Sequence, residues 1–334
     1  MPTALITGAA GQDGFYLASH LRCLGYEVAG LMQPREHRDR QRNLAGNIEL
    51  VTGDMTDMAS LLKALREVQP DEVYNLAAVS SVRTAWDQPI RATDVNGLGL
   101  VNLLEALRAL AGRSVCEIRV FQASSAQIFG DIASERFTEE TPVRPVSPYG
   151  AAKAFAHFTA DAYRREYGMF ISCGILGNHE SPLHGADFVI PRITQAVGRI
   201  AARVQDKLAL DNLTATRDWG FAGDFVVAMH AALQHQRPED FVIATGEVHS
   251  VADAVEAAFA AVGMADWQAY VSTTGVTGGR AQRGARGDIT KARRLLSWSP
   301  TVGFADLITM MVQHYAEQTV EPEHAPAPAR HGTT

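Results

Sequence analysis

Residues 3–14 read TALITGAAGQDG, and this stretch decides the fold. A short apolar run at 3–7 leads into three glycines spaced three residues apart, Gly8, Gly11 and Gly14, and then into the amphipathic residues 15–21. This order predicts a strand, a glycine turn and a helix. Glycines permit a tight turn and let backbone amides approach a pyrophosphate at the helix N-terminus. The stretch therefore favours dinucleotide binding over a plain structural turn.

Strands and helices alternate through the next part of the chain. We expect strands at 26–32, 48–52, 72–76, 115–123, 170–176 and 241–245, and helices at 58–68, 93–110, 149–167 and 223–234. This alternation predicts an α/β fold of Rossmann type, with a doubly wound parallel sheet and a smaller C-terminal substrate-binding α/β region.

The domain boundaries follow from the same pattern. We assign residues 1–176, with contributions from about 220–246, to the dinucleotide-binding domain, and 177–318 mainly to the substrate-binding region. Residues 319–334 are rich in Pro, Ala and polar side chains, which predicts a disordered tail.

Composition narrows the class of protein. The 334 residues are 46% hydrophobic and carry a net charge of −7 with scattered Lys and Arg, which argues against a nucleic-acid-binding surface. Met1 leads directly into an apolar strand, and no apolar run approaches the roughly 20 residues of a membrane span. The three cysteines lack metal-ligand spacing. We expect a cytoplasmic protein with buried thiols and no bound metal.

The end of the second strand bears on the choice of cofactor. Gln33, Pro34 and Arg35 follow it, with no acidic residue to bind the ribose of NAD, whereas an arginine suits the 2′-phosphate of NADP. We favour NADP, keep NAD as possible, and note that the local arginines would otherwise form a solvated loop. The expected cofactor-binding residues are Gly8, Gly11, Gln12, Asp13, Gly14, Arg35, Asp54, Met55, Leu76, Ala78, Ser80, Tyr149, Lys153 and His179.

Tyr149 and Lys153 stand four residues apart at the start of a predicted helix. At that spacing their side chains share one helical face, so the ammonium can hold the phenol below its usual pKa of about 10. Tyr149 would then move a proton at neutral pH. The pattern is common on solvated helix faces, and it gains weight from the glycine turn that precedes it.

With the glycine turn, Ser125, Tyr149 and Lys153, the chain resembles the extended short-chain dehydrogenase/reductases, and more narrowly the GDP-mannose 4,6-dehydratase family over residues 3–316. The matching segments are VQPDEVYNLAA at 68–78, NHESP at 178–182, RDWG at 217–220 and PEDFVIATG at 238–246. The resemblance implies a GDP-sugar substrate bound by Asn178, Arg192, Arg217 and Arg280. It also implies a homodimer or homotetramer that pairs through the helices around 97–110 and 149–167.

The chain departs from the family at the catalytic strand end. The family reads Ser-Thr-Ser-Glu there, with the Thr polarising the sugar O4 and the Glu removing the C5 proton; this chain reads SSAQ at 124–127. Ser125 can replace the Thr, but Gln127 cannot accept a proton, and a general base contributes about 10² to 10⁴-fold to a rate.

We therefore expect an NAD(P)-dependent 4-epimerase of a GDP-sugar, with Ser125, Gln127, Tyr149 and Lys153 at the catalytic centre. The alternatives are a 4,6-dehydratase, a 4-ketoreductase, and a non-enzymatic sugar-nucleotide sensor or inactive partner subunit. Retention of Ser125, Tyr149 and Lys153 argues against the non-enzymatic alternative, because a protein that only binds needs no proton relay.

Overall fold

A seven-stranded parallel sheet forms the centre of the computed structural model, which describes residues 1–33, 48–110, 115–132, 134–185, 187–273 and 284–320. The strand order is β12-β7-β5-β4-β1-β2-β3, and every neighbouring pair is parallel. The strands are β1 (Thr3–Thr7), β2 (Glu27–Met32), β3 (Glu49–Thr52), β4 (Glu72–Asn75), β5 (Arg119–Ser125), β7 (Phe170–Leu176) and β12 (Asp240–Ile243). The order reverses direction between β1 and β4, which is where ligands bind in doubly wound sheets. The predicted fold class is confirmed.

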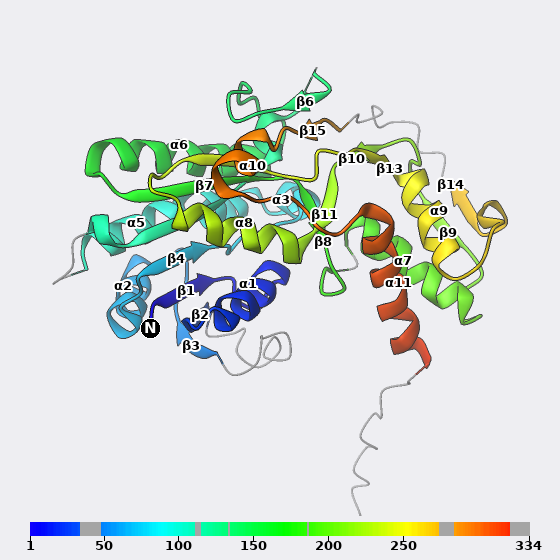
Figure 1. The fold of residues 1–334 in the computed structure, drawn as a ribbon, viewed down its shortest axis with the longest axis horizontal. Helices are drawn as coiled ribbons and strands as arrows, with labels where there is room; N and C mark the ends of the chain where they lie inside the picture. Colours follow the sequence, from blue (N-terminus) through cyan, green and yellow to red (C-terminus); the bar gives the residue numbers. More distant parts are fainter. Residues whose placement is uncertain (34–47, 111–114, 133, 186, 274–283, 321–334) are drawn as a thin grey trace, which may run out of the picture.

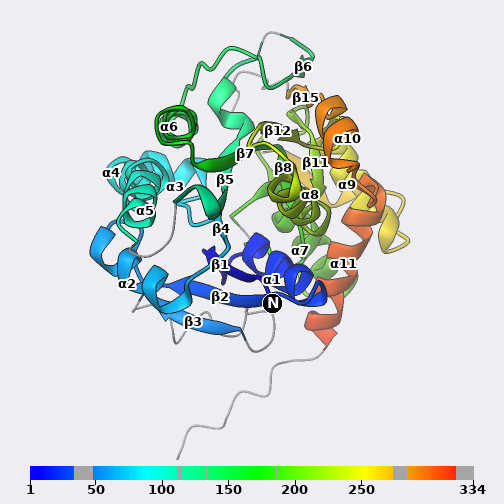
Figure 2. The ribbon, with the colours of Figure 1, turned by 60° about the vertical axis from the view of Figure 1, so that its left-hand side comes forward.

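Helices cover both faces of this sheet (Figure 2). On one face lie α2 (Met58–Val68), α5 (Gly99–Arg108) and α6 (Pro148–Tyr167), and on the other lie α1 (Gln12–Cys23), α8 (Ala222–Gln234) and α10 (Thr290–Leu296). Leu5 packs into the core on the first face, whereas Ala4 and Ile6 pack into the core on the second, because alternate strand residues point to opposite faces. Both faces are covered, which explains why the strand sequences are apolar almost throughout.

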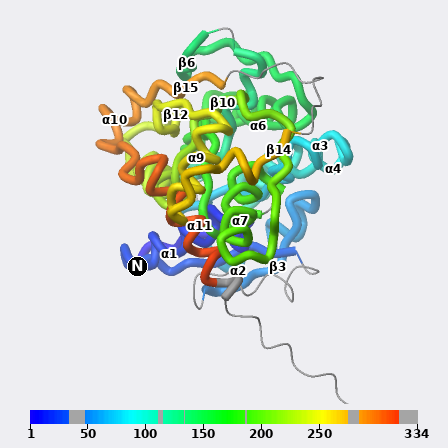
Figure 3. Tube along the Cα trace, turned by 90° about the vertical axis from the view of Figure 1, so that its right-hand side faces the viewer, coloured from blue at the N-terminus to red at the C-terminus, as the bar shows by residue number. Residues whose placement is uncertain are grey.

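A second group of helices lies beyond one end of the sheet (Figures 1 and 3). Helices α7 (Val189–Ala201), α9 (Val251–Ala261) and α11 (Phe304–Val320) pack around a core that includes the buried Trp219. Short strand pairs accompany them: β9 (Leu208–Leu210) with β14 (Val271–Thr273), and β10 (Thr216–Arg217) with β13 (His249–Ser250). A further pair, β6 (Arg136–Phe137) with β15 (Arg286–Gly287), packs instead against the core of the main sheet through Phe137.

One further pair matters most for the site. Strand β8 (Asn178–Glu180) runs parallel to β11 (Trp219–Phe221), with Asn178 opposite Trp219 and Glu180 opposite Phe221. This pairing brings the NHESP and RDWG segments side by side, although about 40 residues separate them in the sequence.

The single helix predicted over 93–110 is wrong. The chain instead forms α4 (Pro89–Thr93), the π-helical turn η2 (Asp94–Leu98) and α5, after a short helix α3 (Val82–Asp87) that the sequence pattern did not predict. Gly97 lies so close to α6 that a Cβ there would stand 3.2 Å from the Phe155 ring. The Asn96 side chain bonds both the amide and the carbonyl of Val79, at 2.8 and 3.1 Å. Local packing therefore breaks the helical repeat, as is frequent near functional sites.

The structure also bears on three smaller predictions, which concern the start of one strand, the burial of the cysteines and the C-terminal tail. Strand β5 begins at Arg119 rather than Val115, because Val115–Glu117 form a 3₁₀ turn. Cys173 is buried, but Cys23 and Cys116 are exposed, so the expectation of three buried thiols is wrong for two of them. Helix α11 extends to Val320, and the predicted tail beyond it lies outside the described residues. None of the described helices is long and apolar enough to cross a membrane.

Candidate active site

A cavity of about 560 Å³ lies at the carboxyl ends of β1, β4, β5 and β7. Residues from several distant segments line it together. The predicted site residues among them are Gly8, Gly11, Gln12, Asp13, Gly14, Leu76, Ala78, Ser80, Ser125, Gln127, Tyr149, Lys153, Asn178, His179 and Arg217.

Other predicted site residues do not line this cavity. Asp54 accepts a hydrogen bond from Gln33 at 3.1 Å and borders a neighbouring hollow, while Met55 is buried in the sheet core. Arg192 is exposed on α7 and donates to the Ala209 carbonyl at 2.6 Å. Arg35 and Arg280 lie outside the described residues.

The glycine turn has the shape that a dinucleotide requires. Gly8 adopts a φ of +72°, and a Cβ on Gly14 would stand 2.5 Å from the Gly8 oxygen, so neither position accepts a side chain without strain. Gly11 caps α1, and no side chain of a described residue bonds the first-turn amides at this cap. These amides can bind an anion, and the turn fits the pyrophosphate of a nicotinamide dinucleotide.

Tyr149 and Lys153 occupy successive turns at the start of α6, whose first turn is capped by the Ser147 side chain accepting from Gly150 N at 3.1 Å. Lys153 donates from Nζ to the Ala123 carbonyl at 2.9 Å and lies 5.8 Å from the centre of the Tyr149 ring. Burial raises the pKa of Tyr149 to about 12, against the opposing effect of a hydrogen bond with Ser125. Burial also lowers the pKa of Lys153 to about 8.

The predicted lowering of the Tyr149 pKa is therefore wrong in direction. Desolvation of the phenol outweighs its hydrogen bond with Ser125, and the charge of Asp13 raises the pKa of Tyr149 further. Tyr149 is protonated at neutral pH, and its hydroxyl is paired with that of Ser125.

A buried polar chain that the sequence did not reveal supports Lys153. Thr7 donates to Asn75 at 2.8 Å, Asn75 donates to Gln122 at 2.7 Å, and Gln122 donates to the Ala123 carbonyl at 2.9 Å. This is the carbonyl that also binds Lys153. A polar residue near the carboxyl end of each of β1, β4 and β5 was the available signal, because buried polar side chains need partners.

His179 forms a closed ion pair at the glycine turn. Its Nε2 lies 2.9 Å from Asp13 Oδ2, its Nδ1 hydrogen-bonds the Gly177 carbonyl at 2.9 Å, and its ring stacks on Phe225. Burial disfavours the imidazolium, but Asp13 outweighs this effect and raises the pKa of His179 to about 9. Burial likewise disfavours the carboxylate, yet His179 holds the pKa of Asp13 below its usual value. The pair is charged at neutral pH and ties the start of α1 to β8.

A second histidine–carboxylate pair lies on the same cavity. Glu180 is 2% exposed, and its Oε2 hydrogen-bonds His184 Nδ1. The His184 ring stacks on Phe188 with 3.9 Å between centroids, and all three residues line the cavity. His184 is not among the site residues predicted from the sequence. The available signal was the spacing of four residues between Glu180 and His184.

The remaining polar groups suit a nucleotide diphosphate and a sugar. Asn178 and Arg217 both line the cavity, and Asn178 on β8 lies opposite Trp219, two residues after Arg217. Burial lowers the pKa of the Arg217 guanidinium. A guanidinium fork matches phosphate oxygens. Gln127, on the turn after β5, places an amide at the position where the family pattern has a carboxylate.

The family model and the relatives that match this chain carry the same description. The family described as GDP-mannose 4,6 dehydratase matches residues 5–311. A protein of Arabidopsis thaliana named GDP-mannose 4,6 dehydratase 2 is 42% identical over 326 residues, which cover 94% of this chain and 87% of that protein. The human GDP-mannose 4,6 dehydratase is 39% identical, with 92% and 90% covered.

The solved structures show the same architecture. The UDP-glucose 4-epimerase of Thermus thermophilus, in complex with NAD, superposes with a TM-score of 0.81 at 27% identity, covering 94% of this chain and 98% of that one. The match therefore extends over the sheet and the C-terminal helices alike.

Proposed function

The chain belongs to the GDP-mannose 4,6-dehydratase family, and we propose on that basis that it oxidises C4 of a GDP-sugar and eliminates water across C5 and C6. One observation carries the oxidative half: the glycine turn, Ser125, Tyr149 and Lys153 line a single cavity with Asn178 and Arg217. The relatives at about 40% identity favour the dehydratase over the 4-epimerase that the sequence favoured. The 4-epimerase stays as a second candidate, because Gln127 is an amide.

We infer that the glycine turn binds the pyrophosphate of the cofactor, and that the nicotinamide lies at the end of the cavity lined by Tyr149 and Lys153. When bound, the nicotinamide would accept hydride from C4 and return it to C6. NADP is proposed over NAD because Arg35, rather than an acidic residue, follows β2. Fluorescence titration with both oxidised cofactors tests this choice; tighter binding of NAD would reverse it.

The side chains of this protein have distinct tasks in the proposed reaction. Ser125 holds the C4 hydroxyl, and the phenolate form of Tyr149 takes its proton. Lys153 stabilises the phenolate from its anchor on the Ala123 carbonyl. Because the pKa of Tyr149 is raised to about 12, the phenolate is scarce at pH 7, and C4 oxidation should accelerate as the pH rises.

Proton NMR of the holoenzyme with GDP-mannose in deuterated water tests the proposal. A new methyl signal with deuterium at C5 is the expected result. Inversion at C4 without deuterium at C5 would instead establish the epimerase. Tight binding without any conversion would leave the 4-ketoreductase and the sensor or inactive-partner alternatives.

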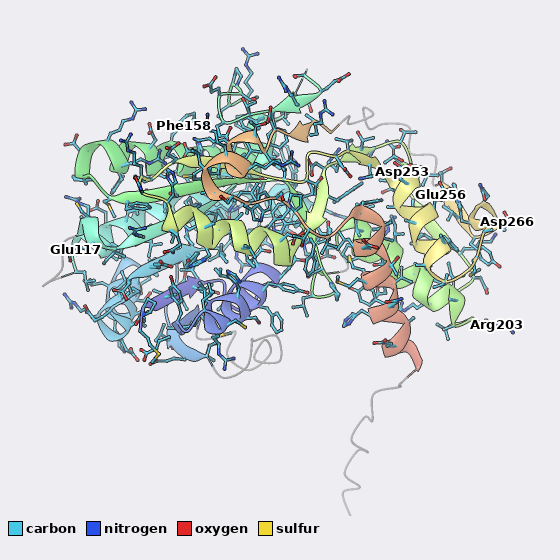
Figure 4. The ribbon with its side chains drawn as sticks, viewed as in Figure 1. Glu117, Phe158, Arg203, Asp253, Glu256 and Asp266 are labelled. Atoms are coloured by element: carbon cyan, nitrogen blue, oxygen red, sulfur yellow. The ribbon has the colours of Figure 1, made fainter. Side chains whose placement is uncertain are left out.

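We also propose that the protein forms a homodimer through α6 and its neighbouring helices. Large apolar side chains are exposed there, including Phe155 and Phe158 on α6, Trp86 on α3 and Ile90 on α4, which is 78% exposed. Phe158 lies on the outer side of the molecule (Figure 4). These helices pack against one another, and exposed apolar side chains gathered on neighbouring helices mark interaction sites. Sedimentation of the Phe158→Glu variant should shift toward a smaller species; a wild-type monomer would refute the proposal.

A further inference from the structure

We propose that His184, oriented by Glu180, is the base that removes the C5 proton of the sugar. This inference rests on the proposed 4,6-dehydration and supplies the proton acceptor that Gln127 cannot provide.

The position of the His184 ring is fixed by several contacts. Glu180 ends β8 and is anchored by the pairing of that strand with β11. The His184 amide donates to the Ser181 carbonyl at 3.0 Å, and its own carbonyl accepts from the Tyr315 hydroxyl on α11 at 3.3 Å. Stacking on Phe188 and the hydrogen bond to Glu180 fix the ring itself. A base held this way loses little freedom when it reacts.

The hydrogen bonds of His184 leave one ring nitrogen for chemistry. Nδ1 is paired with Glu180, and Nε2 makes no hydrogen bond to any residue in the described part of the chain. A buried carboxylate on Nδ1 fixes the tautomer in which Nε2 carries a lone pair, and it stabilises the imidazolium that forms when Nε2 takes a proton. This arrangement is that of a general base with an orienting carboxylate.

The carboxylates and the other histidine that line the cavity are less suited to the task. Asp13 is engaged by His179, and both ring nitrogens of His179 are already bonded. Glu180 is almost fully buried beside His184, and Asp187 is an exposed carboxylate. Charged and titratable groups that face His184 are Glu180 on β8, Asp13 at the start of α1 with its partner His179 on β8, and Tyr315 on α11.

The proposed step is an elimination and needs no added oxidant. Once C4 is a ketone, Nε2 takes the proton from C5, and the electron pair of that C–H bond forms the C5–C6 double bond. The C6–O bond breaks, and the hydroxyl leaves with the proton from His184 as one molecule of water. The step is redox-neutral and restores His184 to its starting form.

The His184→Gln variant tests the proposal, because oxidation at C4 and proton removal at C5 can be measured separately in it. With GDP-mannose in deuterated water, this variant should still form reduced nicotinamide, seen by its absorbance. Deuterium at C5 and the methyl product should fall by about 10² to 10⁴-fold, the contribution of a general base. His235→Gln is the matched control, because His235 follows α8 and does not line the cavity; it should behave as wild type.

A second variant tests the role of Glu180. Glu180→Gln keeps a hydrogen-bond acceptor beside Nδ1 but removes the charge, so the inflection in the pH profile of C5 exchange should move to lower pH. A merely structural role of the pair would leave that inflection in place. Thermal melting of each variant identifies loss of folding.

The outcomes separate the two proposals. Failure of the wild type to form a methyl product would refute the proposed function itself. Dehydration by the wild type with unchanged C5 exchange in folded His184→Gln would overturn the role of His184 alone. Loss of exchange in Asp187→Asn, with His184→Gln unaffected, would assign the base to Asp187 and also overturn it.

Discussion

The two histidine–carboxylate pairs of the cavity contain the same chemical groups but differ in their hydrogen bonds. Asp13 and His179 form a closed pair, because both nitrogens of His179 have partners and its pKa is raised to about 9. Glu180 and His184 form an open pair, with Nδ1 bonded and Nε2 without a hydrogen bond to any described residue. The closed pair is suited to clamping the glycine turn, whereas the open pair is suited to moving a proton. Residue type alone does not decide between these roles.

The largest expected effect is that of Tyr149→Phe, which leaves both pairs intact. Without the phenol, the C4 hydroxyl has no proton acceptor, and formation of reduced nicotinamide should fall by about 10² to 10⁴-fold. Deuterium at C5 should disappear with it, because C5 is acidic only beside the C4 ketone. Single-turnover absorbance and NMR measure the two steps. Persistent C5 exchange in this variant would mean that the open pair acts independently of oxidation.

The double variant Gln127→Glu with His184→Gln tests whether a carboxylate can replace the open pair. Both side chains line one cavity, so the carboxylate introduced by Gln127→Glu should restore part of the exchange lost in His184→Gln, by about tenfold or more. The single Gln127→Glu variant is the control. No restoration in a folded double variant, measured as deuterium at C5, would show that residue 127 does not reach the reacting carbon.

Asp13→Asn and Glu180→Gln compare the two pairs by stability. Asp13→Asn leaves a buried imidazolium without its counter-charge, which costs about 3 kcal/mol for a broken buried pair. Glu180→Gln should cost less, because the amide oxygen of Gln still accepts the hydrogen bond from His184 Nδ1. Chemical denaturation gives both free energies of unfolding. A larger loss of unfolding free energy in Glu180→Gln than in Asp13→Asn would indicate that the open pair, rather than the closed pair, is the ionic one.

The sequence predicted the sheet better than the sugar-binding end, for physical reasons. The strand at Thr3–Thr7 and the following glycines are local signals, since apolar periodicity and backbone freedom act within a few residues. The sequence also predicted that the glycine turn lies close to Tyr149 and Lys153, because both segments occupy fixed places in the alternating strands and helices of a Rossmann-type sheet.

The features that were missed depend on contacts between distant segments. The chain from Thr7 through Asn75 to Gln122 joins three strands, and the π-helical turn at Asn96 depends on its bonds to Val79. The pKa of Tyr149 depends on its burial, which the four-residue spacing from Lys153 does not reveal. His184 is four residues from Glu180, yet its role depends on where β8 places both of them against the cavity.

The smallest expected effect is a pH dependence of stability that belongs to the closed pair. The pKa of His179 is higher in the folded chain, at about 9, than its ordinary value of 6.5, so its contribution is complete below pH 6.5 and is lost as the pH rises through about 9. The Asp13 pKa is lowered on folding, so its contribution is present above its ordinary value of 3.8 and is lost in acid. The wild-type Tm should therefore fall between about pH 7 and about pH 10 by a few degrees more than that of His179→Gln. His184→Gln should retain the wild-type fall, since the closed pair is intact in it; an equal fall in wild type and His179→Gln would contradict the charged state assigned to that pair.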